Sequence, residues 1–178
     1  MVVFDCYSVM KNILITGGSG FIGSEIVDQL WKNGDWKITV LDCMTKQIHG
    51  EQWGNSYLYK KIEGKCNFIY GDIRNYDDVI KAIENQDYII HLAAETGTGQ
   101  SMYEINRYNE VNIMGMSNIF QAISLSKENK IKKIVLASSR SVYGEGKYLC
   151  PKCGEVYPKS RSRINMLKGD FKMYCSKC

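Results

Sequence analysis

The sequence is poor in proline and contains no long apolar run. Only two of the 178 residues are proline and 44% are hydrophobic, so we expect one main domain with one sizeable core. No segment approaches the roughly 18 consecutive apolar residues of a membrane helix, and the first ten residues lack the basic start, apolar run and cleavage site of a signal peptide. We therefore expect a cytoplasmic protein without a membrane partner.

Charge and cysteine are unevenly distributed along the chain. Residues 1–150 carry 16 basic and 17 acidic side chains, whereas residues 151–178 carry seven basic and two acidic ones. Of the seven cysteines, Cys6, Cys43 and Cys66 are scattered, and the other four lie between positions 150 and 178. In a cytosolic chain, scattered cysteines are usually small core residues, while paired ones more often bind metal than form disulfides.

Short apolar runs alternate with longer segments of helical period. Such runs, nearly continuous in aliphatic residues, are typical of parallel strands that are covered on both faces. The alternation predicts an α/β fold with a doubly wound, Rossmann-like parallel sheet, which we place at residues 1–147. Strands are predicted at 11–16, 37–41, 67–70, 88–92 and 133–138, and helices at 22–33, 75–84 and 103–126.

A glycine-rich turn separates the first predicted strand from the first predicted helix. Gly17, Gly20 and Gly23 follow one another at a spacing of three residues. A tight turn requires glycine, and a backbone without Cβ atoms can approach a pyrophosphate closely. The N–H groups at the start of the helix, at Phe21 and Ile22, present a partial positive charge to the phosphates. The turn therefore predicts a dinucleotide-binding site.

An acidic residue ends the second predicted strand. Asp42 lies 19 residues after Gly23, where a carboxylate can accept hydrogen bonds from the ribose hydroxyls of the adenosine half. The same charge repels a 2′-phosphate, so the predicted cofactor is NAD rather than NADP. The alternative is that Asp42 only caps the loop that begins at Cys43.

Further motifs resemble a known family. Gly-Asp-Ile-Arg at 71–74 follows the third predicted strand, His-Leu-Ala-Ala at 91–94 ends the fourth, and residues 137–144 follow the fifth with a serine-rich motif that ends in Val-Tyr-Gly. Together with the glycine turn, these motifs resemble the extended short-chain dehydrogenase/reductases over residues 11–144. That family includes nucleotide-sugar epimerases and dehydratases.

The resemblance implies cofactor contacts at the ends of two strands. Asp72 would bond the adenine amino group, with Ile73 beside the ring. Leu92, Ala93 and Ala94 would line the cofactor at the end of the fourth strand. The alternative for Asp72 is an ordinary turn residue after a glycine.

The resemblance also implies two residues of the catalytic region. Asn112 matches the asparagine of an Asn-x-x-Gly motif on the long helix and would help to order the active site. Alternatively, Asn112 is an amide satisfied within the core. Ser139 would be the catalytic hydroxyl that hydrogen-bonds the reacting oxygen of the sugar, with Ser138 and Ser141 as neighbouring alternatives.

A narrower resemblance concerns two loops and the cysteine-bearing segment. Residues 91–102 and 139–146 resemble the dTDP-L-rhamnose 4-epimerase type within the family, which implies a nucleotide-linked deoxysugar as the substrate. Thr96, Gly97 and Gln100 would then form a loop above the nicotinamide and the sugar. Otherwise these residues form a flexible glycine turn.

The family's catalytic Tyr-x-x-x-Lys pair is not expected in this chain. Its tyrosinate takes a proton from a sugar hydroxyl, and its lysine lowers the pKa of the tyrosine. Here Tyr57 and Lys61 precede the third strand, while Tyr143 and Tyr148 lie among glycines and a proline, where no regular helix would form. We therefore expect a chain that binds NAD but is catalytically incomplete, with the substrate subdomain absent.

The cysteines of the last segment form two Cys-x-x-Cys pairs. Cys150 and Cys153 are followed by Cys175 and Cys178 after 21 intervening residues. Four soft ligands suit tetrahedral zinc and leave no open position, so residues 148–178 predict a zinc-ribbon-like insert with a structural ion. Reduced, unliganded thiols are the alternative. A net charge of about +3 with zinc bound is modest for a zinc ribbon, so we expect no nucleic-acid partner.

These expectations combine into one function with two alternatives. The leading one is the NAD-binding portion of a nucleotide-sugar 4-epimerase, which acts through a transient 4-keto sugar and forms a homodimer when full length. A dehydratase or reductase of the same family is the nearest alternative, although dehydratases usually place acidic residues beside the catalytic serine and Arg140 follows Ser139 here. A non-catalytic, redox-sensing NAD-binding module is the alternative from another class.

Overall fold

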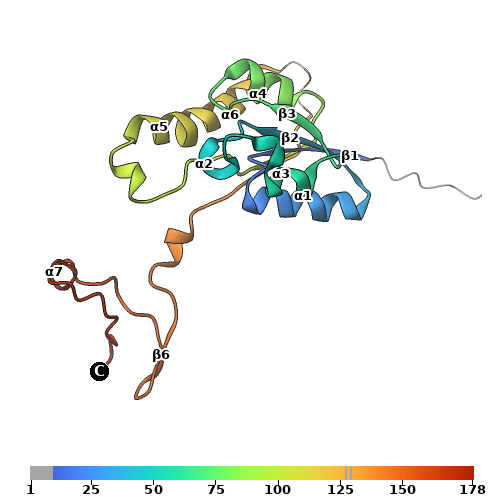
Figure 1. Cartoon of the computed structure of the whole chain (residues 1–178). Helices are drawn as coiled ribbons and strands as arrows, with labels where there is room; N and C mark the ends of the chain where they lie inside the picture. The colour runs from blue at the N-terminus through green and yellow to red at the C-terminus, as the bar shows by residue number, and fades with distance from the viewer. Residues whose placement is uncertain (1–9, 127, 129) are drawn as a thin grey trace, which may run out of the picture. The chain divides into compact units, whose positions relative to one another are not determined.

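The chain folds into two compact units. A computed structural model describes residues 10–126, 128 and 130–178 (Figure 1). Unit 1 spans Met1–Ala137 and unit 2 spans Ser138–Cys178. The predicted boundary between 147 and 148 lies inside unit 2 and stays a prediction, and Cys6 lies outside the described residues. In the part of the chain that the structure describes, no helix is long and apolar enough to cross a membrane.

Unit 1 contains a five-stranded parallel sheet in the order β3-β2-β1-β4-β5. The register sets Ile15 of the central strand beside Val40 on one side and Ile90 on the other. The doubly wound parallel sheet predicted from the apolar runs is therefore confirmed, with every strand end within two residues of the predicted one. The strands are β1 (Lys11–Thr16), β2 (Trp36–Asp42), β3 (Asn67–Tyr70), β4 (Tyr88–His91) and β5 (Lys133–Leu136).

Three helical segments match the predicted ones. Helix α1 (Phe21–Asn33) ends at Gly34, which adopts a left-handed φ of 75° and donates its N–H to the Trp31 carbonyl. Helix α4 (Tyr76–Ile83) begins at Asn75, whose side chain accepts the N–H of Asp77. The long predicted helix at 103–126 is α5 (Ile105–Asn109), a π-helical turn η3 (Glu110–Met114) and α6 (Gly115–Leu125).

Several short helices were not predicted. Three of them follow β2 and one precedes α5. They contain three to six residues each, which is too short for a helical period to be recognised in the sequence. They are α2 (Lys46–His49), η1 (Trp53–Asn55), α3 (Tyr57–Ile62) and η2 (Gln100–Met102).

Helices cover both faces of the sheet, and a core lies on each face. Neighbouring side chains of a strand point to opposite faces, so Leu14 packs in one core and Ile15 in the other. Val79 of α4 and Ile119 of α6 share the core of Leu14, whereas α1 and α3 contribute to the core of Ile15. This arrangement explains why the central strands are apolar at nearly every position.

Strand β5 forms one edge of the sheet and is poorly covered. Its pairing partner is β4, with Ile90 opposite Val135 and His91 opposite Leu136. Val135 is 50% exposed and Leu136 is 57% exposed. The sequence of β5 is apolar, as in a strand covered on both faces, but the described residues leave two of its apolar side chains exposed.

Unit 2 contains few regular elements. A 3-10 helix η4 (Arg140–Tyr143) precedes a two-stranded antiparallel hairpin made of β6 (Tyr148–Cys150) and β7 (Gly154–Val156). Helix α7 (Arg163–Leu167) follows. The cysteine pairs lie at the hairpin and at the C-terminal end of this unit.

Candidate functional site: a dinucleotide cavity and a cysteine cluster

The glycine turn after β1 is required by close packing of the backbone. Gly17 has a φ of +68°, and a Cβ atom there would lie 2.7 Å from the Ala93 nitrogen. A Cβ atom on Gly23 would lie 2.4 Å from the Gly17 carbonyl oxygen. For Gly20 the nearest atom is again that oxygen, at 3.3 Å, so this position faces open space beyond one tight contact. Two of the glycines thus serve the fold, and the third leaves room for a ligand.

The N-terminus of α1 carries polar groups that the described residues do not satisfy. Its first turn has no side-chain cap and no acidic residue within the described chain. The N–H groups of Phe21 and Ile22 have no acceptor inside their own helix, because they belong to its first turn. The Ser19 hydroxyl is fully buried and also lacks a hydrogen-bond partner among the described residues. These donors fit an anionic group such as a pyrophosphate.

Asp42 joins the glycine turn to the end of β2. Its Oδ2 accepts the backbone N–H of Ser19 at 2.9 Å, and its Oδ1 accepts the N–H of Met44 at 3.0 Å. The capping role that we left open for Asp42 is therefore present in the structure. Each carboxylate oxygen can accept more than one hydrogen bond, so this cap leaves acceptor capacity for ribose hydroxyls.

A cavity of about 230 Å³ lies at the carboxyl ends of these strands. This is where a parallel α/β sheet usually binds its ligand. The cavity brings together seven of the residues predicted to contact the cofactor. They are Gly17, Asp42, Asp72, Ile73, Leu92, Ala93 and Ala94.

Other lining residues were not predicted from the sequence. They come from the loops after β2 and β4, from the motif after β3 and from the start of the long helix. Apart from Arg74, which lies in the same motif as Asp72, they reach the cavity only because distant segments meet in the fold. They include Cys43, His49, Arg74, Glu95, Arg107 and Val111.

Asp72 forms an ion pair with Arg74 in the cavity wall. The Arg74 Nε lies 3.0 Å from Oδ1 of Asp72, and its Nη2 lies 2.6 Å from Oδ2. Burial acts to raise the pKa of Asp72, but the hydrogen bonds from Arg74 outweigh it and lower that pKa. The carboxylate is thus ionised, and its lone pairs are shared between Arg74 and any adenine amino group. The predicted role of Asp72 toward adenine stays a prediction.

Two titratable groups in the cavity are uncharged at neutral pH. Burial, helped by the nearby carboxylates of Asp72 and Asp42, raises the pKa of the Cys43 thiol to about 11. Burial lowers the pKa of His49 although Asp42 lies nearby, and the His49 Nδ1 is 2.9 Å from the Ser56 hydroxyl oxygen. The negative charge where the cavity borders β2 and its following loop therefore comes from Asp42, and Cys43 and His49 add none.

The loop that follows β4 is fixed by the long helix. Asn112 is exposed, and its amide accepts the N–H of Glu95 at 2.8 Å and donates to the Glu95 carbonyl at 3.1 Å. Arg107 adds an ion pair of 2.8 Å to the Glu95 carboxylate. These contacts hold position 95, the residue that leads into the predicted substrate loop.

The predicted substrate loop is held by one tyrosine. The hydroxyl of Tyr108 lies 2.9 Å from the Thr96 carbonyl oxygen and 3.0 Å from that of Gly97. It also lies 3.4 Å from Oε1 of Gln100. The three acceptors share the single hydroxyl proton of Tyr108, and the contacts to the first two hold the start of the loop. Nothing in the sequence marks Tyr108 for this role beyond its place on the predicted helix.

Ser139 belongs to unit 2 and caps the N-terminus of helix η4. Its Oγ accepts the N–H of Ser141 at 3.1 Å. Tyr143 ends the same short helix before Gly144, and Tyr148 lies in strand β6. Neither tyrosine shares a helix with the lysine four residues later, as expected from the neighbouring glycines and proline.

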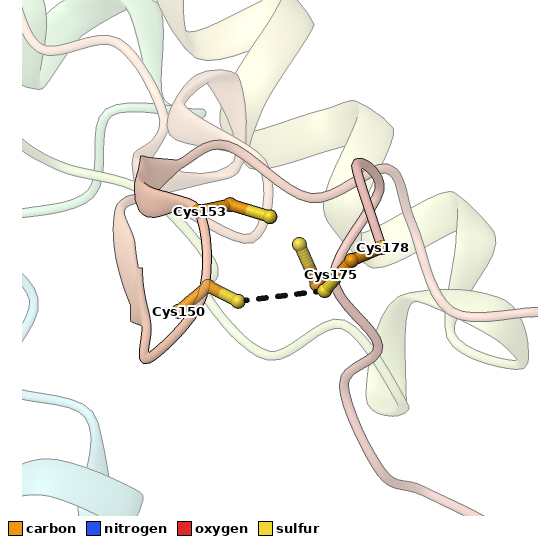
Figure 2. Close-up of side chains that lie close together, drawn as sticks. All are labelled: Cys150, Cys153, Cys175 and Cys178. Atoms are coloured by element: carbon orange, nitrogen blue, oxygen red, sulfur yellow. Dashed lines mark hydrogen bonds between the residues drawn. The ribbon is translucent and has the colours of Figure 1, made fainter.

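Four cysteines of unit 2 converge on one point (Figure 2). Their sulfur atoms all lie within 4.8 Å of one another, and those of Cys150 and Cys178 are 3.6 Å apart. All four are free thiols. The Sγ of Cys175 accepts the backbone N–H of Lys177 at 3.4 Å. The structure thus brings together the four predicted metal ligands, Cys150, Cys153, Cys175 and Cys178, in an arrangement that could hold one metal ion.

Comparison with known proteins identifies the family. A model of the NAD dependent epimerase/dehydratase family matches residues 13–162. The chain belongs to this family. The matched region includes the glycine turn and the cavity residues and ends before Cys175 and Cys178. The resemblance inferred from the motifs is therefore confirmed.

Curated members of the family show the same relationship. The chain is 36% identical over 158 residues to a dTDP-L-rhamnose 4-epimerase of Burkholderia thailandensis, which covers 88% of the chain and 42% of the relative. It is 35% identical over 141 residues to a bifunctional UDP-glucose and UDP-xylose 4-epimerase of Arabidopsis thaliana, covering 78% of the chain and 39% of the relative. The chain thus spans about two fifths of the length of these family members.

Solved structures of the family share the fold of this chain. The UDP-N-acetylglucosamine 4-epimerase of Methanobrevibacter ruminantium matches with a TM-score of 0.59 and 33% identity, over 85% of this chain and 44% of that one. The UDP-glucose 4-epimerase of Thermus thermophilus, solved with NAD, matches with a TM-score of 0.59 and 28% identity, over 72% of this chain and 37% of that one. These matches agree with the Rossmann-like fold of the chain.

Proposed function

We propose that this chain is the NAD-binding portion of a nucleotide-sugar 4-epimerase. One observation carries the proposal: a hydrogen bond joins the glycine turn to Asp42, and Gly17 and Asp42 line one cavity together with five other predicted cofactor residues. When bound, NAD would take a hydride from the sugar carbon and return it to the opposite face. The 4-keto sugar formed between these two steps gives the change of configuration.

The residues of the cavity have distinct roles in this proposal. The turn at Gly17, Gly20 and Gly23 lets the backbone approach the pyrophosphate, and the first N–H groups of α1 bind it. Asp42 accepts hydrogen bonds from the ribose hydroxyls and repels a 2′-phosphate, which favours NAD over NADP. The negative charge of Asp42 is the main support for that preference.

The substrate end is proposed from fewer contacts. The loop at Thr96, Gly97 and Gln100, fixed by Tyr108, would border the nicotinamide and the sugar. The Ser139 hydroxyl would donate a hydrogen bond to the reacting oxygen of a nucleotide-linked deoxysugar. The arginine after Ser139 favours an epimerase over a dehydratase, which remains the second candidate.

The chain by itself is proposed to bind the cofactor without turnover. A Tyr-x-x-x-Lys pair on a helix after β5 is needed to remove the proton from the sugar hydroxyl. Tyr57 and Lys61 share α3, but α3 precedes β3, and no described helix of unit 2 carries such a pair. We also propose that the full-length enzyme is a cytoplasmic homodimer. A second, structural cofactor is proposed at the cysteine cluster, where four thiolates would bind one zinc ion.

Calorimetry and activity assays test this proposal. Titration of the purified chain should give saturable NAD binding and weaker NADP binding. Nucleotide-sugar epimerisation should be absent from the chain alone and present once it is expressed with a C-terminal region that carries the Tyr-x-x-x-Lys helix. A chain that binds neither dinucleotide would overturn the proposal, and turnover by the 178 residues alone would overturn its claim of catalytic incompleteness.

A further inference from the structure

Unit 2 has almost no apolar core. Among the described residues of unit 2, a single hydrophobic residue is buried, Val156, which is 2% exposed. Leu149 is 80% exposed and Leu167 is 78% exposed. Its strands have three residues each and α7 has five. Burial of apolar surface therefore cannot offset the conformational entropy that ordering this segment costs.

The polar contacts of unit 2 are also weak supports. Arg161 joins two distant parts of the unit, because its Nη1 lies 3.0 Å from the Glu145 carboxylate and its Nε donates to the Phe171 carbonyl at 2.9 Å. Both side chains of the ion pair are partly open to water, where such pairs contribute little to stability. The bond from the Tyr174 hydroxyl to Asp170, 2.7 Å long, is local.

The cysteine cluster is the remaining long-range connection. It joins the hairpin, which carries Cys150 and Cys153, to the C-terminal pair of Cys175 and Cys178 across the 21 intervening residues. The 3.6 Å between the sulfurs of Cys150 and Cys178 excludes a disulfide, whose bond length is about 2.05 Å. Four converging thiols without a disulfide are the donor set of a soft, tetrahedral metal ion.

We infer that unit 2 folds only when the cluster binds one zinc ion. The inference rests on the structural zinc proposed above and extends it from occupancy to folding. Each thiol releases its proton to solvent as it becomes a thiolate ligand, and no electron is transferred. The unfolded segment cannot hold four sulfurs at one point, so the free energy of zinc binding becomes free energy of folding for unit 2. Unit 1 has its own two cores and does not need the metal.

Hydrogen exchange on the full chain tests this inference. The chain is prepared with zinc under reducing conditions, stripped with a chelator, and then reloaded with zinc alone. Elemental analysis should give about one zinc per chain before stripping. Amides of 138–178 should lose their protection on stripping and regain it on reloading. Amides of 11–126 serve as the internal reference and should not change.

Single substitutions provide the matched comparison. Cys150→Ser and Cys175→Ser should each abolish stoichiometric zinc binding and leave unit 2 unprotected even with zinc present. Cys66→Ser is the control, because Cys66 lies in unit 1 and outside the cluster. It should retain the zinc and the protection of unit 2.

The possible outcomes separate the two levels of the proposal. Absence of stoichiometric zinc, or iron in its place, overturns the zinc assignment together with this inference. Zinc that binds while the exchange of unit 2 stays the same with and without it overturns the coupling alone. NAD titration of the same samples reports separately on the proposed function, because the cofactor cavity lies in unit 1.

Discussion

The backbone N–H of Ser19 donates a hydrogen bond of 2.9 Å to Oδ2 of Asp42. This bond connects the turn after β1 with the last residue of β2, so the groups proposed to bind phosphate and ribose are held at one end of the strands. Asp42 therefore orders the turn, and in the proposed function it also accepts hydrogen bonds from the ligand. Substitutions of Asp42 can separate the ordering of the turn from the binding of the ligand.

Removal of the Asp42 carboxylate should weaken NAD binding. Asp42→Ala loses the charged acceptor of the ribose hydroxyls and of the Ser19 N–H, and hydrogen bonds to charged groups contribute about 1.5–3 kcal/mol. We expect the dissociation constant for NAD to rise about 10- to 100-fold, as measured by calorimetry. The preference for NAD over NADP should narrow, because the charge that repels a 2′-phosphate is gone.

Asp42→Asn is the matched control, because it keeps the size and shape of the side chain and removes only its charge. Its amide oxygen can still accept the Ser19 N–H, so the turn should stay ordered while the charge is lost. NADP should then bind closer to NAD in affinity, with a smaller loss of stability than in Asp42→Ala. Unchanged selectivity in both variants would contradict the role of Asp42 in cofactor choice.

Two glycines of the turn should respond differently to alanine. In Gly23→Ala the new Cβ would meet the Gly17 carbonyl oxygen at 2.4 Å, which forces the backbone apart and should lower the free energy of unfolding by about 1–3 kcal/mol. In Gly20→Ala the nearest atom is at 3.3 Å, so stability should change little. NAD affinity should still fall about tenfold or more, which corresponds to about 1.4 kcal/mol, because the methyl group would lie where we propose that the pyrophosphate binds. Urea unfolding measures the change in stability and calorimetry the change in NAD affinity. An equal loss of stability in Gly23→Ala and Gly20→Ala would contradict the different roles of the two glycines.

Removal of one hydroxyl should loosen the loop after β4. Tyr108→Phe loses the bonds to the Thr96 and Gly97 carbonyl oxygens, a cost of about 0.5–1.5 kcal/mol. The amide of Ser101, which donates to Gly97, should then exchange faster with solvent. Tyr103→Phe, at an exposed neighbouring position, should leave that exchange rate unchanged.

Asp87 should contribute stability that acid removes. The hydrogen bond from Lys132, followed by that from the Asn12 N–H, lowers the pKa of Asp87 to about 2 from its usual 3.8. A carboxylate with a lowered pKa stabilises the fold above its unfolded pKa, and this contribution disappears as the pH falls from about 4 to about 2. The difference in unfolding free energy between the wild type and Asp87→Asn should therefore be constant near neutral pH and shrink over that range. A difference that does not change with pH would rule out this linkage.

Much of the fold could be predicted because its signals are local. Aliphatic runs marked all five parallel strands, and Gly34 marked the end of α1. The segment between β2 and β3 was missed because its short helices depend on tertiary packing. Trp53 packs edge-on against Tyr59 with ring centres 5.0 Å apart, and Ile62 is buried in the core beside β2. The π-helical turn inside the long helix also has no periodic signature.

The same distinction applies to the cavity. The glycine turn and Asp42 were predictable, since the turn follows one strand and Asp42 ends another, and both strand ends are visible in the sequence. The pairing of Asp72 with Arg74 was within reach, because the two residues are separated by one position in a single motif. The contact of Arg107 with Glu95 joins a helix to the loop after β4, and only the folded chain brings these residues together.

The outer side of β5 presents backbone N–H and C=O groups without a neighbouring strand among the described residues. Such a row is a template onto which another extended segment can add, and the exposed Val135 and Leu136 would favour the addition. Concentrated solutions of this polypeptide should consequently self-associate edge to edge. The unpaired N–H and C=O groups of β5 would then form hydrogen bonds with a strand of a second molecule, and the sheet would continue from one molecule into the next.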